Sequence, residues 1–209
     1  MFFNKKPVMA PKPTMPKETI ESYLAFTKSV TRSKEDRLKD LQLLVNHPRV
    51  TDLAFYHGKL PEKYTMYREN DPVNIDWLLI GTNHISIKRN GRLYFIGEFL
   101  VYVSRLNSAG AISPSLYVEN LTPPNNARGG PRQRSLDAND DMFHGHPHIF
   151  GNLSAFCMSD GSDEIRYFIS EGNMPAAFDF IDEALHSAGP HQPICDISFW
   201  PSIPIIERR

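Results

Sequence analysis

The chain has only two cysteines, Cys157 and Cys195, among its 209 residues. Two thiols cannot form the several disulfide bonds that hold small secreted domains together. No apolar stretch approaches the length of a membrane-spanning helix, and the first residues contain no apolar run of signal-peptide length. The sequence therefore predicts a cytoplasmic protein with free thiols and no membrane partner.

Net charge is also nearly absent, because 23 Lys and Arg residues are balanced by 24 Asp and Glu residues. The one local excess of basic residues, at Arg128, Arg132 and Arg134, lies within a single polar segment. Binding of duplex nucleic acid requires a broader basic stripe. We therefore expect no nucleic-acid partner.

Apolar residues make up 41% of the chain, which is enough for one core in a chain of this length. Residues 1–17 are rich in proline and are expected to form an extended arm. We expect residues 18–209 to form a single domain, with an extra helix within residues 18–32. A second helix is predicted to begin after an N-cap at Ser33 and to end before Pro48.

The middle of the chain changes to the residue pattern of strands. Three segments have strand character: residues 51–56, 75–81 and 115–121. A hairpin is expected around Asn90 and Gly91, which tolerate the positive φ angles of a tight turn. Four apolar residues in its second arm share one parity: Phe95, Phe99, Val101 and Val103. Gly97 interrupts them and is expected to mark a bulge.

Residues 122–143 form a long loop, a feature that is uncommon in compact domains and often functional. Residues 158–162 are expected to form a turn, and residues 165–169 form an apolar segment whose type the pattern does not decide. A carboxy-terminal helix is predicted over residues 173–185, and the apolar tail around Trp200 is expected to pack on the core. Together these elements predict an α+β fold.

Three alternating histidines follow the long loop, at His144, His146 and His148, and Cys157 comes shortly after them. These residues have a structural interpretation, in which the imidazoles bind loop carbonyls and the thiol is a small buried apolar group. They could also bind zinc, although their spacing matches no closed zinc module.

The segment also resembles the zinc isopeptidases of the JAB/MPN type, in which two histidines and a later aspartate bind the metal. His144, His146 and Pro147 followed by Ser154 match that pattern. Cys157, however, occupies the position of the aspartate. This alternative implies a metal site at His144 and His146.

The sequence His146-Pro147-His148 ahead of Cys157 is similar to the His-Pro-Asn motif of the ubiquitin-conjugating enzymes, which lies shortly before their catalytic cysteine. The resemblance extends over residues 34–203, with His148 in place of the asparagine. Its further segments are residues 37–48, 75–81, 97–103, 173–185 and 196–203, the last of which resembles bacterial and phage-encoded relatives.

This resemblance implies a fold with an amino-terminal helix, a four-stranded antiparallel meander, an active-site loop and a carboxy-terminal helix. It implies that Cys157 accepts a ubiquitin-like modifier as a thioester and transfers it to an acceptor. The implied partners are the modifier, an activating enzyme of the ThiF-like type, a protein substrate and a JAB-type isopeptidase, in a bacterial setting and with no cofactor. An inactive binding module of the same fold is a further alternative.

The residue chemistry suits this function. The thiolate of Cys157 is a good nucleophile near neutral pH. His148 can donate an N–H to the oxyanion where an asparagine amide would act, and unlike asparagine it titrates. His146 and Pro147 are expected to shape the loop, and Cys195 is expected to be a buried structural thiol. Further polar candidates, near the cysteine in sequence, are Asn152, Ser154, Asp160, Asp163 and His186.

Overall fold

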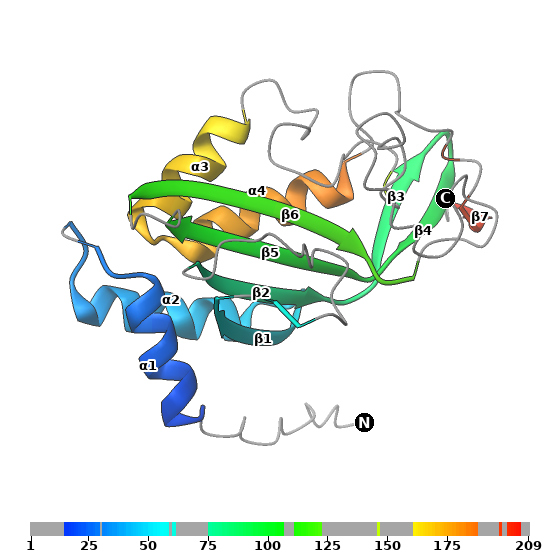
Figure 1. Cartoon of the computed structure of the whole chain (residues 1–209). Coiled ribbons are helices and arrows are strands. Elements are labelled where there is room, and N and C mark those ends of the chain that lie inside the picture. The colour runs from blue at the N-terminus through cyan, green and yellow to red at the C-terminus, as the bar shows by residue number, and fades with distance from the viewer. Residues whose placement is uncertain are drawn as a thin grey trace, which may run out of the picture.

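The computed structural model of the protein describes residues 15–29, 31–58, 60–61, 75–106, 111–122, 146, 161–187, 197 and 200–205. Four helices and a four-stranded antiparallel sheet form its main body, and a small three-stranded sheet extends from one end (Figure 1). The predicted α+β fold is therefore confirmed. No helix among the described residues is long and apolar enough to cross a membrane.

Two helices precede the sheet, α1 (Lys17–Phe26) and α2 (Lys34–Asn46). The predicted N-cap of α2 is confirmed, because Ser33 Oγ accepts a hydrogen bond from the Asp36 amide at 3.1 Å. This contact satisfies one of the amides that have no partner within the first turn of a helix. The Ser33 hydroxyl also donates to the Asp36 carboxylate and lowers its pKa. Of the predicted arm, only residues 15–17 are described, and α1 begins at Lys17.

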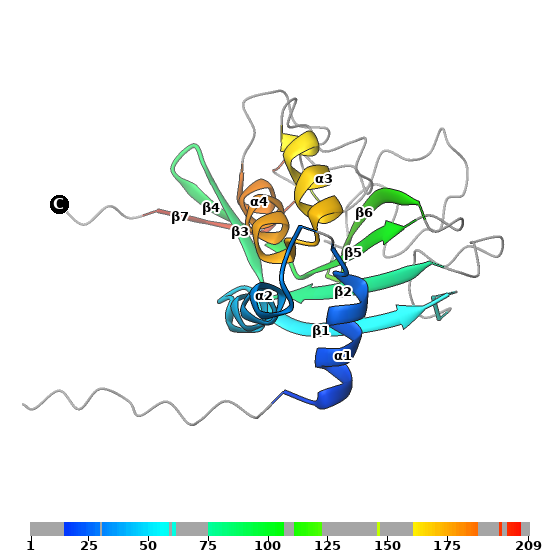
Figure 2. The same ribbon diagram turned by 90° about the vertical axis from the view of Figure 1, so that its left-hand side faces the viewer.

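The strands form two antiparallel sheets. The four-stranded sheet has the order β1 (Val50–His57), β2 (Asp76–Thr82), β5 (Phe99–Leu106) and β6 (Ile112–Asn120). The hairpin strands β3 (Ile85–Arg89) and β4 (Arg92–Gly97) continue the directions of β2 and β5 and pair with each other, and β4 also pairs with β7 (Ser202–Pro204). Figure 2 shows this hairpin projecting beyond the helices. The chain thus forms one meander whose two central strands are bent.

The bend occurs at the predicted bulge. Ile85 pairs with Gly97, whereas Ser86 pairs with Phe95, so one residue of β4 has no partner in β3. Gly97 has a φ of 144°, a conformation that favours glycine. The predicted shared parity of Phe95 and Phe99 is wrong, because the extra residue reverses which side chains of β4 face the core. Ile96 is buried there instead.

The helices after the loop cover one face of the sheet. They are α3 (Gly161–Glu171) and α4 (Met174–His186), and the buried residues of all four helices join one core with that face. The apolar segment at residues 165–169 is helical, since Ile165 and Ile169 lie one turn apart and are both fully buried. The predicted turn at residues 158–162 is wrong where it is described, because residues 161–162 begin α3.

The carboxy-terminal predictions are confirmed. The Asn173 side chain caps α4 by accepting a hydrogen bond from the Ala176 amide. Trp200 is 2% exposed in the main core, and β7 pairs with β4. On the opposite face of the sheet a smaller apolar cluster contains Leu60, Trp77, Leu79 and Tyr102.

A buried guanidinium joins two helices to the sheet. Arg105 of β5 is 3% exposed, and its nitrogens donate to the carbonyls of Phe26 and Lys28 at 2.7 and 2.9 Å. It also donates to the carbonyls of Ile169 and Ser170, at 2.7 and 2.5 Å. These carbonyls lie at the ends of α1 and α3, where the negative ends of the helix dipoles favour a cation.

Candidate functional site

His146 is the one member of the predicted catalytic set whose position is described. The following predicted residues lie outside the described residues: His144, Pro147, His148, Asn152, Ser154, Cys157, Asp160 and Cys195. The roles predicted for them therefore stay predictions. The surroundings of His146 show how the scaffold holds the chain shortly before Cys157.

His146 is 2% exposed and is held between α4 and the start of β5. Its Nε2 lies 2.9 Å from the carbonyl oxygen of Leu185. Because a carbonyl oxygen can only accept, Nε2 carries a proton in this contact. The ring also packs edge-on against Phe99, with 5.8 Å between ring centroids and 66° between ring planes. The contacts fix both the position and the rotation of the imidazole.

The partner of His146 is a carbonyl that the helix itself leaves without a hydrogen bond. Leu185 lies in the last turn of α4. The last four carbonyl oxygens of a helix receive no hydrogen bond from the helix's own amides. The amide of Ser187 donates to Ala184 rather than to Leu185. His146 therefore completes the carboxyl end of α4, and a hydrogen bond of this kind contributes about 1 kcal/mol.

Phe99 is a rigid support for the ring because the bend around it is heavily hydrogen-bonded. Its amide donates to Thr82 Oγ1 at 3.0 Å, and its side chain is fully buried. On the other side of the bend, Asn120 Nδ2 donates to the Ile96 carbonyl at 3.0 Å. A Cβ atom added to Gly97 would lie 2.3 Å from Asn120 Oδ1, so only glycine permits this approach.

The last described residues before the predicted long loop are attached to the same bend. Thr122 Oγ1 accepts from the Glu98 amide at 3.0 Å, and the Leu121 amide donates to the Glu98 carbonyl at 2.7 Å. His146 contacts the next residue, Phe99. Thr122 and His146 are therefore both in contact with the bend between β4 and β5. They are also consecutive described residues, since 123–145 lie outside the described ranges.

A group of charged side chains lies directly beyond this anchor. His186 is the last residue of α4, and its Nδ1 lies 2.8 Å from the Asp182 carbonyl oxygen and 3.3 Å from Asp182 Oδ1. The hydrogen bond to Asp182 raises the pKa of His186, and burial opposes this effect. Arg49 Nε lies 4.0 Å from the other carboxylate oxygen of Asp182.

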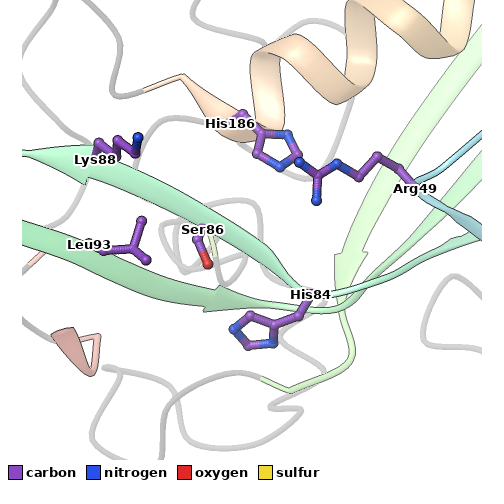
Figure 3. A pocket seen from close by; sticks show the side chains of 6 residues that line it. All are labelled: Arg49, His84, Ser86, Lys88, Leu93 and His186. Carbon is purple, nitrogen blue, oxygen red and sulfur yellow. The ribbon is translucent and has the colours of Figure 1, made fainter. Parts of the chain in front are cut away.

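These side chains border a hollow of about 400 Å³ between α4 and β3 (Figure 3). Its lining residues in the described part of the chain are Arg49, His84, Ser86, Lys88, Leu93 and His186. Figure 3 shows the Arg49 guanidinium and the His186 ring pointing toward one another across from the hairpin strands. The hollow begins one residue after Leu185, whose carbonyl binds His146.

No three His, Cys, Asp or Glu side chains within the described ranges are grouped so that they could hold a metal ion. The alternative metal site at His144 and His146 includes a residue outside those ranges.

The residues that line the hollow are not marked as a unit in the sequence. Arg49, His84 and Lys88 are separated along the chain from His186, and nothing in their local patterns marks them. His186 was a candidate through its sequence position alone, and the structure places it in the hollow. Asp163, a candidate on the same ground, is 85% exposed in its side chain on α3 and lies 3.5 Å from Arg166.

The chain was compared with protein-family models, curated proteins and solved structures. None of the three comparisons finds a match.

Proposed function

We propose that this protein is a carrier of the ubiquitin-conjugating type, which accepts a ubiquitin-like modifier as a thioester on Cys157 and passes it to an amine. The observation that carries the proposal is the anchoring of His146, the first residue of the His-Pro-His segment. It is buried between Phe99 and the Leu185 carbonyl, as a residue that positions a reactive loop would be.

The order of elements supports a fold like that of the ubiquitin-conjugating enzymes. A helix, α2, precedes four strands that follow one another across the sheet, and two helices, α3 and α4, come after Cys157 in the chain. This chain adds α1 in front and extends its two central strands into the β3–β4 hairpin, which β7 joins. Neither addition interrupts the meander.

The proposed chemistry consists of two acyl transfers. In the first, the Cys157 thiolate attacks the modifier's thioester on the activating enzyme, a new S–C bond forms, and the activating enzyme's thiolate leaves. In the second, an acceptor amine attacks the Cys157 thioester, a C–N bond forms, and the Cys157 thiolate leaves while the amine proton passes to a base. His148 would donate an N–H to the oxyanion in both steps.

His146 has a positioning role in this proposal. Its ring is almost inaccessible and its Nε2 proton is directed at a backbone carbonyl, so it is not available to donate that proton to a substrate. This agrees with the prediction that His146 and Pro147 shape the loop. The chemical roles fall to Cys157 and His148.

The test is the intact mass of the tagged protein, purified without reductant from the cells that express it naturally. We expect a fraction with the mass of a small protein added, which a thiol reductant releases. The adduct should be lost in Cys157→Ala and retained in the matched control Cys195→Ala. An adduct that survives in Cys157→Ala would contradict the proposal, as would stoichiometric zinc that is lost in His144→Ala.

A further inference from the structure

The hollow between α4 and β3 brings together several hydrogen-bond donors, most of which have no acceptor among the described residues. Within the described part of the chain, the side chains of His84, Ser86 and Lys88 bind no protein acceptor. The Arg49 guanidinium has one acidic neighbour, Asp182, at the long distance of 4.0 Å. Cationic and hydroxyl donors from separate elements thus face one space with their hydrogen-bonding capacity unused.

His186 provides a second and independent sign of a missing partner. Its Nδ1 is engaged with Asp182, whereas its Nε2 is buried and has no hydrogen-bond partner. Buried polar atoms are nearly always paired, so this unpaired nitrogen indicates a contact that the described residues do not supply. His186 borders the hollow, although its Nε2 is not itself exposed.

The charges of the lining select an anion. Arg49 and Lys88 contribute two cationic side chains, and the negative groups beside them are the Asp182 carboxylate and the carboxyl end of the α4 dipole. A single carboxylate would need only one cation. A phosphate monoester carries about −1.5 to −2 near neutral pH and accepts through three oxygens, which matches two cations, a hydroxyl and imidazoles better.

Size and shape agree with an organic phosphate rather than with a bare ion. The hollow measures about 400 Å³, inside the range of about 300–1,000 Å³ that is typical of small-molecule sites. Leu93 contributes an apolar side chain to the lining and lies beside Lys88 on the neighbouring strand, as Figure 3 shows. An apolar group attached to the phosphate would contact this side chain.

We propose that this hollow binds a small phosphate monoester, with the Arg49 guanidinium and the Lys88 ammonium on the phosphate and Leu93 on the organic group. The guanidinium offers a planar pair of N–H donors to two phosphate oxygens, and the ammonium acts as a point charge. Ser86 and the imidazoles of His84 and His186 complete the donor set. The site goes beyond the proposed carrier function and does not depend on Cys157.

The experiment is a calorimetric titration of the full chain with phenyl phosphate at low ionic strength, together with NMR of the imidazole signals. We expect binding that shifts the signals of His84 and His186. Lys88→Gln should weaken it by about tenfold, and so should Arg49→Gln. The control Lys39→Gln removes the same charge from an exposed side chain of α2 and should change the affinity less than about twofold.

Two other titrations identify the ligand class. Benzoate has the same ring but a single negative charge, and inorganic phosphate has no organic group, so both should bind more weakly than phenyl phosphate. Equal binding of either would overturn the assignment of a phosphate monoester. Absence of phenyl phosphate binding would overturn it as well, and so would an affinity unchanged in Lys88→Gln, an exposed position whose substitution leaves the core intact.

Discussion

Arg105 and His146 both bind the carbonyls at helix ends, but they do so with very different strength. Arg105 is a permanent cation that contacts the carbonyls of four residues at the ends of α1 and α3. His146 places one N–H on one carbonyl at the end of α4. Both side chains are almost completely buried.

Arg105 joins two helices to the sheet, whereas His146 places one described position of the chain against the end of α4. The Arg105 contacts hold two helices against β5, and its removal would leave several buried carbonyls without a donor. The His146 contacts hold the chain just ahead of Cys157 against the end of α4. In the proposed carrier these contacts place the start of the His-Pro-His segment on the scaffold that Arg105 stabilises.

The largest effect is expected from Arg105→Leu. The substitution leaves the buried carbonyls at the ends of α1 and α3 unpaired, and we expect a loss of about 4 kcal/mol in the free energy of unfolding. Urea denaturation measures it. The matched control is Arg166→Leu, at a half-exposed arginine on α3, which should change stability by less than about 0.5 kcal/mol. Similar losses of stability in the two variants would show that the buried contacts of Arg105 contribute no more than an exposed arginine does.

The next effect concerns the bend on which His146 rests. Gly97→Ala combines a φ of 144° with a Cβ atom 2.3 Å from Asn120 Oδ1. We expect a loss of about 3 kcal/mol in unfolding free energy. Gly91→Ala is the control, because its φ is 68° and nothing lies within 4 Å of the added atom. It should lose about 1 kcal/mol, and equal losses would show that the contact with Asn120 is unimportant.

His146→Ala tests the loop side of the comparison directly. It removes the donor to Leu185 and the ring packed on Phe99, and we expect a loss of about 2 kcal/mol in stability. Amide exchange should accelerate most in the last turn of α4. His57→Ala, at a histidine whose side chain is 76% exposed, serves as the control and should have little effect. Unchanged exchange in α4 would argue against the anchor.

The smallest effect is a pH dependence at the end of α4. Because Asp182 raises the pKa of His186 above its ordinary value of 6.5, His186 stabilises the fold fully below that value. This contribution should disappear as the pH rises through the raised pKa of the folded state. The urea midpoint of the wild type, followed across this window, should fall more than that of His186→Gln. Parallel curves for the two proteins would contradict the prediction. Arg105 adds no pH dependence in this window, because its guanidinium stays charged.

Much of the fold could be predicted because its signals are local. The Ser33 cap, the turn at Asn90 and Gly91, the bulge at Gly97 and the cap at Asn173 each depend on residues a few positions apart. The helix α3 was undecided because five residues are too few to show its period, and Phe95 was misassigned because a bulge reverses parity.

The site was less predictable because its contacts are distant in sequence. The histidines before Cys157 were conspicuous, but nothing local indicates that His146 binds the Leu185 carbonyl 39 residues later. The same holds for Arg105, whose partners lie up to 79 residues away. Likewise, Arg49 and His186 meet only because α4 ends beside the start of β1.

The central claim is that Cys157 carries the modifier, and Cys157→Ser tests it most directly. The serine variant should trap the modifier as an oxyester, which thiol reductants do not cleave and alkali does. Peptide mapping of the variant, purified from cells that express it naturally, should locate the bond at residue 157. A variant that accumulates no adduct, or one whose modifier is bound to a lysine or to Cys195, would contradict the account.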